Sequence, residues 1–337
     1  MASASASARA PDLGLPSIAL SSGTRMPLFG LGTWQSGKDE VRKAVVAALE
    51  AGYKAIDGAA GYGNENEVGD ALADCVARGV VTREEVFLTS KLWAADFWPE
   101  KAMAALDKTL AELKTPYLDL YLVHWPYPID TAKGATFNGP PELRSGYSAE
   151  HYLSVWRVLE QAVDAGKIRA IGTSNMSAKK LAELLAGCRI KPAVNQVESH
   201  PMCAQTKLIA WCAKRGIATT AFSPLGSPAR PARLVAEGDP APLHHPAVEA
   251  IAARLGRTTA QVLIRWQIQR GVVVIPKSVT PARIVENANV NFELSAEDMA
   301  ALLALDQGHR LNKGGSWVLP GATTDSLWDD DWSGLNE

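Results

Sequence analysis

The chain has 337 residues, and its 34 Lys and Arg residues nearly balance 36 Asp and Glu residues, which gives a formal net charge of −2. Charges of both signs are mixed along the chain, so neither nucleic acid nor a membrane surface is an expected partner. No apolar run approaches the ~20 residues that span a membrane. This length suits one large α/β domain or two smaller domains.

The cysteines and the N-terminus bear on the expected compartment. None of the four cysteines forms a Cys-x-x-Cys pair or lies at zinc-site spacing from histidine; they are Cys75, Cys188, Cys203 and Cys212. We therefore expect free thiols, no metal site and a cytoplasmic location. Residues 1–15 begin with a Ser/Ala-rich stretch without an apolar centre, which predicts a disordered tail. A fragment of an organelle transit peptide is the alternative.

From residue 16 onward, β-type runs alternate with helical patterns. The first apolar helical stripe runs from Val41 to Leu49, and the helix that it predicts ends at Gly52. The β-type runs occupy residues 29–32, 53–57, 86–90, 118–123, 168–172, 193–197, 218–222 and 272–275. Eight β/α units predict one α/β domain over residues 16–311, a closed (β/α)8 TIM barrel; an open doubly wound sheet is the alternative. Gly30-Leu-Gly32 lacks the third glycine of a dinucleotide fingerprint, which argues against a Rossmann domain.

Three segments are longer or more irregular than the rest. Residues 126–149 and 226–245 follow β-type runs and are rich in turn-forming residues, so we expect them to shape a site at the barrel mouth. Residues 312–337 contain Trp317, Trp328 and Trp332. We expect this C-terminal segment to fold over the mouth or to pack beside it.

Four polar residues stand at the ends of three β-type runs. Asp57, Lys91 and His124 each end a run, and Tyr62 follows Asp57 closely. Because the carboxyl ends of parallel barrel strands converge on one mouth, these side chains are expected to meet. A free tyrosine titrates at about pH 10, and a neighbouring ammonium group lowers that pKa. The set therefore predicts a phenol tuned to give up a proton.

Seven motifs in order carry a family resemblance. They are GYKAIDGAAGYGNE (52–65), SKLW (90–93), HWP (124–126), GTSN (172–175), NQVE (195–198), FSPLG (222–226) and IPKSVTPARIVEN (275–287). On these motifs the chain resembles the aldo-keto reductase family over about residues 20–311, and within it the plant-type aldehyde and aldose reductases. The resemblance implies a monomeric barrel that reduces aldehydes or aldoses by hydride transfer from NADPH.

The resemblance also assigns roles to the four polar residues. Tyr62 would be the general acid that protonates the carbonyl oxygen, and Lys91 would lower its pKa. Asp57 would pair with Lys91 and hold it in place. His124 would hydrogen-bond the substrate oxygen and orient it.

By the same resemblance, the cofactor site comes mainly from the second half of the chain. Phe222, where the family usually has tyrosine, would stack on the nicotinamide. Lys277, Ser278 and Arg283 would bind the adenosine 2′-phosphate and favour NADPH over NADH. The other expected cofactor residues are Thr33, Trp34 and Asp57 at the mouth, Ser174, Asn175 and Gln196 at the carboxamide, Ser223, Leu225 and Ser227 along the pyrophosphate, and Glu286 and Asn287 at the adenine.

An aromatic substrate funnel is also expected. Trp34, Trp93 and Trp125 follow or overlap the functional positions and would line it together with His124, while Trp98 and Trp317 are further candidates. Such a funnel suits aldehydes of many shapes.

Three other functions stay open at this point. A sugar-phosphate reductase would need a basic mouth residue, for which the candidates are Lys133, Arg144 and Arg230. A catalytically silent NADPH-binding regulatory module would use the same fold. A barrel isomerase or aldolase would use Lys91 as a Schiff base and would leave Lys277 and Arg283 unexplained.

Overall fold

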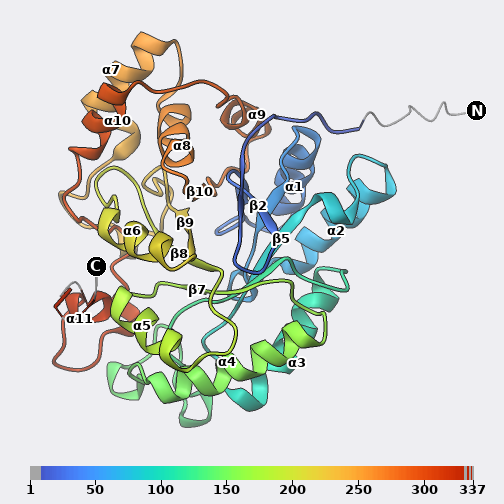
Figure 1. The fold of residues 1–337 in the computed structure, drawn as a ribbon, viewed down its shortest axis with the longest axis vertical. Helices are drawn as coiled ribbons and strands as arrows, with labels where there is room; N and C mark the ends of the chain where they lie inside the picture. The colour runs from blue at the N-terminus through green and yellow to red at the C-terminus, as the bar shows by residue number, and fades with distance from the viewer. Residues whose placement is uncertain (1–8, 330–331, 334, 336–337) are drawn as a thin grey trace, which may run out of the picture.

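Eight parallel strands form a barrel that is surrounded by helices (Figure 1). The computed structural model describes residues 9–329, 332–333 and 335. The barrel strands are β3 (Leu31–Gly32), β4 (Ala55–Asp57), β5 (Phe87–Leu92), β6 (Leu120–Val123), β7 (Ile171–Ser174), β8 (Val194–Glu198), β9 (Ala218–Phe222) and β10 (Val273–Val274). They neighbour one another in chain order, and each overlaps one of the predicted runs. The predicted α/β barrel is therefore confirmed.

The first and last strands meet and close the barrel. Phe29 forms a parallel bridge with Val274. The Gly30 N–H donates to the Val274 carbonyl at 3.0 Å, and the Val274 N–H donates to the Leu28 carbonyl at 2.8 Å. An open doubly wound sheet would leave these two edges unpaired, so that alternative is wrong.

Each strand leads to a helix on the outside of the barrel. These helices are α1 (Glu40–Glu50), α2 (Glu65–Ala77), α3 (Pro99–Glu112), α4 (Ala149–Asp164), α5 (Ala178–Gly187), α6 (Thr206–Lys214), α8 (Thr259–Gln269) and α9 (Pro281–Ala288). In α1 the predicted apolar stripe, including Val41, Val45 and Leu49, is fully buried. Two helices are additions to the repeat, α7 (Pro246–Leu255) and α10 (Ala296–Leu303), and they pack with α8 around a separate apolar cluster.

A hairpin that the sequence analysis did not predict closes the amino-terminal end of the barrel. Strands β1 (Ser17–Ala19) and β2 (Arg25–Pro27) pair antiparallel immediately before the first barrel strand. Leu20 and Met26 from this hairpin are buried in the same apolar core as the barrel strands. The hairpin therefore leaves the opposite, carboxyl end of the strands as the open mouth.

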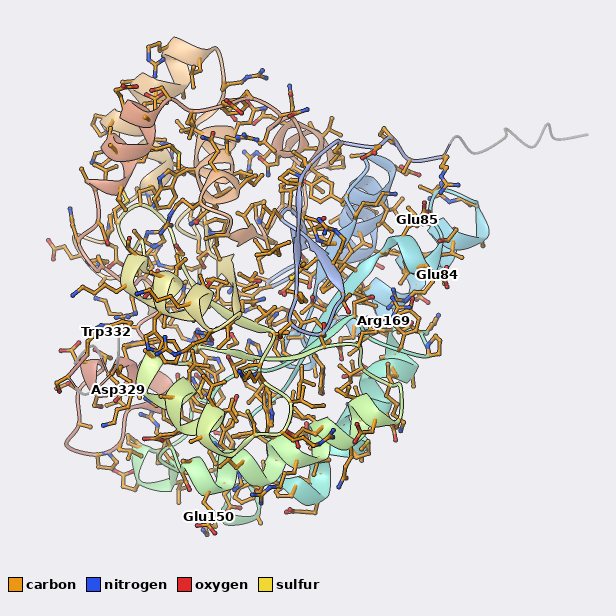
Figure 2. All side chains as sticks on the ribbon, viewed as in Figure 1. Glu84, Glu85, Glu150, Arg169, Asp329 and Trp332 are labelled. Carbon is orange, nitrogen blue, oxygen red and sulfur yellow. The ribbon has the colours of Figure 1, made fainter. Side chains whose placement is uncertain are left out.

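Part of the expected N-terminal tail packs at this amino end. The Ala10 N–H donates to the Val80 carbonyl at 3.1 Å. Gly52 has φ +95°, and a Cβ at this position would lie 2.4 Å from the Pro11 carbonyl oxygen, so the turn after α1 admits this stretch only because it has no side chain. Arg9 pairs with Glu85, which Figure 2 labels beside this stretch. Residues 1–8 of the expected tail lie outside the described residues.

The C-terminal segment lies at the mouth. It contains a 3-10 turn at Gly315–Trp317 and the short helix α11 (Asp325–Trp328). Trp317 and Trp328 pack with Tyr127 and Ile129 of the 126–149 loop in a third apolar cluster. Figure 2 labels Asp329 and Trp332 on the α5 and α11 side of the molecule. Residues 330, 331, 334, 336 and 337 lie outside the described part. Within the described ranges, no helix is long and apolar enough to cross a membrane.

Candidate active site

The four predicted polar residues meet at the mouth. Lys91 on β5 is fully buried, and its Nζ lies 2.5 Å from Asp57 Oδ1 at the end of β4. The same Nζ donates to the Gly58 carbonyl at 2.8 Å and to Tyr62 Oη at 3.3 Å. Tyr62 is the last residue of a 3-10 turn, Ala60–Tyr62, which follows β4. The ammonium group is thus held by two oxygens and turned toward the phenol.

The protonation states of this group follow from burial and charge. Burial raises the pKa of the Tyr62 phenol, and Lys91 lowers it only in part, so the net direction is upward. The net lowering that we expected is therefore wrong for this structure, because the sequence does not show how deeply the phenol lies. Burial would lower the pKa of Lys91, but Asp57 and Tyr62 hold it above its ordinary value. At neutral pH, Tyr62 is a protonated acid beside a charged lysine.

His124 faces the same phenol from the end of β6. Its ring centroid lies 5.5 Å from that of Tyr62 and 5.3 Å from that of Trp93, in edge-on arrangements. Burial and the Lys91 ammonium hold the pKa of His124 well below its ordinary 6.5. His124 is therefore a neutral imidazole at neutral pH, which can orient an oxygen by a hydrogen bond.

A cavity of about 910 Å³ opens beside these residues. Lys91 lies behind Tyr62 and outside the lining. All the other predicted catalytic, cofactor and substrate residues line this one cavity: Thr33, Trp34, Asp57, Tyr62, Trp93, His124, Trp125, Ser174, Asn175, Gln196, Phe222, Ser223, Leu225, Ser227, Lys277, Ser278, Arg283, Glu286 and Asn287.

Two amides next to Tyr62 are held in fixed orientations. Gln196 Nε2 donates to Asp57 Oδ2 at 2.7 Å. Asn175 Nδ2 donates to the His124 carbonyl at 2.9 Å and to Ser174 Oγ at 3.2 Å. The Asn175 Oδ1 is buried, and it has no hydrogen-bond partner among the described residues. This orphaned acceptor fits the amide N–H of a bound carboxamide.

Two cations gather at one arm of the cavity, beyond β10. Lys277, Ser278 and Arg283 line this arm, and Lys277 Nζ donates to the Gln35 carbonyl at 3.0 Å. Burial lowers the pKa of Lys277, and Glu40 offsets this in part. Lys277 and Ser278, in the loop after β10, and Arg283, in the first turn of α9, form a suitable phosphate site.

The other arm of the cavity has an aromatic wall. Trp93 lies 5.3 Å from Phe137 and 6.4 Å from Trp317, and Trp125 lies 5.3 Å from Trp317, measured between ring centroids. Trp317 therefore joins the predicted funnel. Trp98 does not line the cavity, and its Nε1 donates to the Ile129 carbonyl at 3.2 Å.

Several residues near the site were given no role from the sequence, among them Phe137, Asn312 and Glu65. Phe137 lines the cavity from residues 126–149 and Asn312 lines it from residues 312–337. No periodic pattern marks a position in either segment. Glu65 is buried behind Lys91's strand, where it accepts from Ser90 Oγ at 2.5 Å and from Thr109 Oγ1 at 3.0 Å. Glu65 is the last residue of the first motif, and this position was the available signal for its role.

A closed (β/α)8 barrel whose mouth holds a tyrosine, a buried lysine–aspartate pair and a histidine is the architecture of a class of barrel oxidoreductases. Comparison with known proteins agrees with this class. The sequence profile of the family described as "Aldo/keto reductase family" matches residues 28–307. The chain therefore belongs to the aldo/keto reductase family.

Individual relatives cover nearly the whole chain. Aldo-keto reductase family 1 member A1 of Sus scrofa is 46% identical over 313 residues, which cover 91% of this chain and 93% of that protein. An aldo/keto reductase of Synechocystis sp. is 44% identical over 314 residues, covering 92% of this chain and 95% of the relative. The crystal structure of a Bombyx mori aldo-keto reductase in complex with NADP is similar with a TM-score of 0.78 and 35% identity, over 88% of this chain and 94% of that one.

Proposed function

We propose that this protein is an NADPH-dependent carbonyl reductase that converts aldehydes, including aldoses, into alcohols, with Tyr62 as the general acid. The observation that carries the proposal is the placement of Tyr62 beside Lys91 and His124, on the wall of a cavity with an aromatic arm and a cationic arm. The NADP bound by the Bombyx mori relative supports the cofactor.

The residues present fit this cofactor. The orphaned Asn175 Oδ1 would accept from the carboxamide, Phe222 would stack on the ring, and Lys277 and Arg283 would hold the 2′-phosphate. When bound, the reduced nicotinamide supplies a hydride to the carbonyl carbon of the substrate.

The chain's own residues supply the proton and the orientation. As charge develops on the substrate oxygen, the Tyr62 Oη proton moves to it, because an alkoxide is a stronger base than a phenolate. The Lys91 ammonium stabilises the phenolate that remains. Neutral His124 holds the substrate oxygen within reach of Tyr62.

The sugar-phosphate alternative has little support, because each of the three candidate cations already has partners within the protein, including Arg230, which lines the cavity. Lys133 is largely exposed and lies 3.0 Å from Asp130. Arg144 donates to the Val318 carbonyl at 2.6 Å, and Arg230 lies 2.6 Å from an aspartate in its own loop. The Schiff-base alternative is also weak, because a charged, fully buried Lys91 is not a free nucleophile.

The decisive experiment measures NADPH oxidation with simple aldehydes, aldoses and aldose phosphates. We expect turnover of aromatic and simple aldehydes, slower turnover of aldoses and little turnover of phosphates. Binding of NADPH without turnover of any substrate would favour the alternative of a catalytically silent regulatory module.

Three further points stay predictions. The plant-type subgroup is one, because the relatives reported above come from a mammal, a cyanobacterium and an insect. A cytoplasmic location is another, supported by four free cysteines. A monomeric state is the third.

A further inference from the structure

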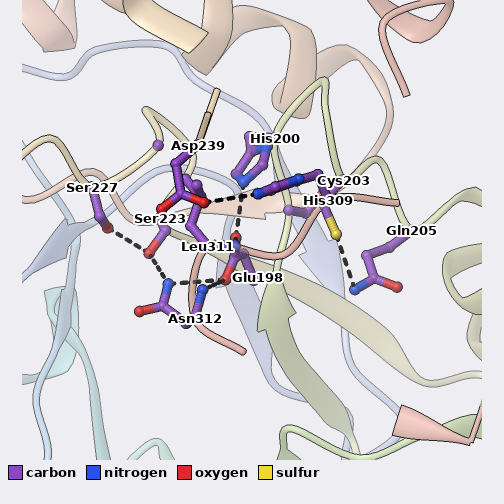
Figure 3. A network of polar contacts seen from close by, with 12 residues as sticks. Glu198, His200, Cys203, Gln205, Ser223, Ser227, Asp239, His309, Leu311 and Asn312 are labelled. Carbon is purple, nitrogen blue, oxygen red and sulfur yellow. Dashed lines mark hydrogen bonds and ion pairs between the residues drawn. The ribbon is translucent and has the colours of Figure 1, made fainter. Parts of the chain in front are cut away.

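A buried carboxylate near the cavity has no role in the proposed chemistry. Glu198, the last residue of β8, is 2% exposed. Its two oxygens accept four hydrogen bonds, from His200 Nε2 at 2.9 Å, Leu311 N at 2.7 Å, Asn312 N at 2.8 Å and Asn312 Nδ2 at 2.9 Å (Figure 3). Burial would raise the pKa of Glu198, but these hydrogen bonds outweigh it and hold the pKa below its ordinary value. Glu198 is therefore a fixed acceptor that anchors the start of the C-terminal segment.

This anchor fixes the orientation of the Asn312 side chain. A carboxylate only accepts hydrogen bonds, so the amide nitrogen of Asn312 must face Glu198. Its second N–H proton donates to Ser223 Oγ at 3.2 Å, as Figure 3 shows. Both amide protons are thus used, and Ser223 must accept from Asn312.

The next link is a pair of hydroxyls in the loop after β9. Ser227 Oγ donates to Ser223 Oγ at 2.6 Å. Each hydroxyl has one proton, and one of the two protons lies in the bond between them. Ser223 accepts from both Asn312 and Ser227, which occupies both lone pairs of its oxygen, so its own proton points away from these two donors. Both serines line the cavity, so that proton is available to a ligand there.

The backbone also holds this pair in place. Ser223 has φ +51° and Ser227 has φ +44°, a region that residues other than glycine adopt only when their surroundings hold them there. The Gly226 N–H donates to the Ser223 carbonyl at 2.9 Å and closes the turn between them. A tight turn therefore holds the hydroxyl pair in place, and Asn312 contacts Ser223 of this turn from the C-terminal segment.

We propose that Asn312, anchored on Glu198, is a positioning residue for the cofactor. By occupying one lone pair of Ser223, while Ser227 occupies the other, it directs the free Ser223 proton into the cavity, where it donates to the pyrophosphate of NADPH. This inference rests on the proposed function, since it assumes that the cavity binds NADPH. It assigns the C-terminal segment a part in cofactor binding as well as in the substrate wall.

The test is Asn312→Ala, with cofactor affinity measured by quenching of the intrinsic fluorescence. The dissociation constant for NADPH should rise about tenfold, which corresponds to the loss of about 1.4 kcal/mol. The affinity for 2′-AMP, which carries the 2′-phosphate without a pyrophosphate, should not change. An equal loss for both ligands would show a general disturbance of the cavity and overturn the proposal, as would unchanged NADPH affinity.

A double-mutant comparison separates this role from simple packing. In a Ser223→Ala, Ser227→Ala background, Asn312→Ala should have almost no further effect on NADPH, because its effect passes through the hydroxyls. Additive losses would contradict the proposal. Asn138→Ala is the matched control, since Asn138 is an exposed asparagine of another mouth loop, and it should leave NADPH affinity unchanged. A wild-type protein that binds no NADPH would overturn the proposed function itself, whereas binding that ignores Asn312 would overturn only this inference.

Discussion

Among single residues, Tyr62 shows how two opposing influences give a usable acid. Burial keeps the phenol protonated, and the Lys91 ammonium at 3.3 Å stabilises the phenolate that forms after the proton leaves. A lowered resting pKa is therefore unnecessary, because the charge that Lys91 offsets appears only during the reaction.

Tyr62→Phe should abolish reduction while NADPH still binds. The change removes the proton donor and leaves the ring, so the rate should fall by at least the ~10²–10⁴ that general acid catalysis supplies. Steady-state rates with one aldehyde and a fluorescence titration of NADPH measure the two effects separately. Near-full activity in this variant would refute the role of Tyr62.

Lys277→Ala combined with Arg283→Ala should weaken NADPH far more than NADH. Only NADPH carries the 2′-phosphate that these two cations would face, so we expect a loss of at least about tenfold for NADPH. The ratio of the two dissociation constants is the measurement. Equal losses for both cofactors would remove the 2′-phosphate assignment.

At the scale of elements, the C-terminal segment forms one wall of the site through a few fixed contacts. Arg144 of the 126–149 loop donates to the Gly315 carbonyl at 3.1 Å and to the Val318 carbonyl at 2.6 Å, on both sides of Trp317. The Tyr127 hydroxyl donates to the Leu327 carbonyl at 3.2 Å. The indole of Trp317 is thus held against the cavity by a neighbouring loop.

Arg144→Met should loosen this wall. Without the guanidinium, the segment that carries Trp317 loses two charged hydrogen bonds, each worth ~1.5–3 kcal/mol in a protein. We expect the KM for aromatic aldehydes to rise several-fold, with little change in the dissociation constant of NADPH. Lys133→Met is the control, because this exposed cation of the same loop forms its ion pair with Asp130 and not with the C-terminal segment that the structure describes. A fall in kcat at constant KM would count against a role in substrate contact.

At the scale of the whole molecule, His124 makes stability depend on pH. Its pKa in the folded protein lies well below the unfolded value of 6.5, so the unfolded chain binds the proton more readily. The stability is complete above pH 6.5 and is lost as the pH falls toward the folded pKa, by up to about 1.4 kcal/mol per pH unit. Urea unfolding at several pH values measures this slope. His124→Gln should have a flatter slope over that window, and an identical slope would contradict the assignment.

The parts that the sequence predicted are those with a repeating physical pattern. Strands such as Phe87–Leu92, buried along their whole length, and stripes such as that of α1 are visible as periodicity. The convergence of Asp57, Lys91 and His124 followed from strand ends. The β1–β2 hairpin was missed because its strands form no buried apolar run: of their six residues only Met26 is buried. The raised pKa of Tyr62 and the place of Asn312 depend on tertiary burial and loop conformation, which no local pattern encodes.

The opposite placement of the chain's two described ends has a practical consequence. Residues 9–15 run along the closed end of the barrel, whereas the segment around Trp317 and Trp328 forms part of the mouth (Figure 1). An affinity handle or a surface linker attached at residue 9 would therefore start at the end of the barrel opposite the mouth. The same attachment at the other terminus would follow directly on the residues that shape that opening. Immobilisation of this protein on a solid support should use the N-terminal route.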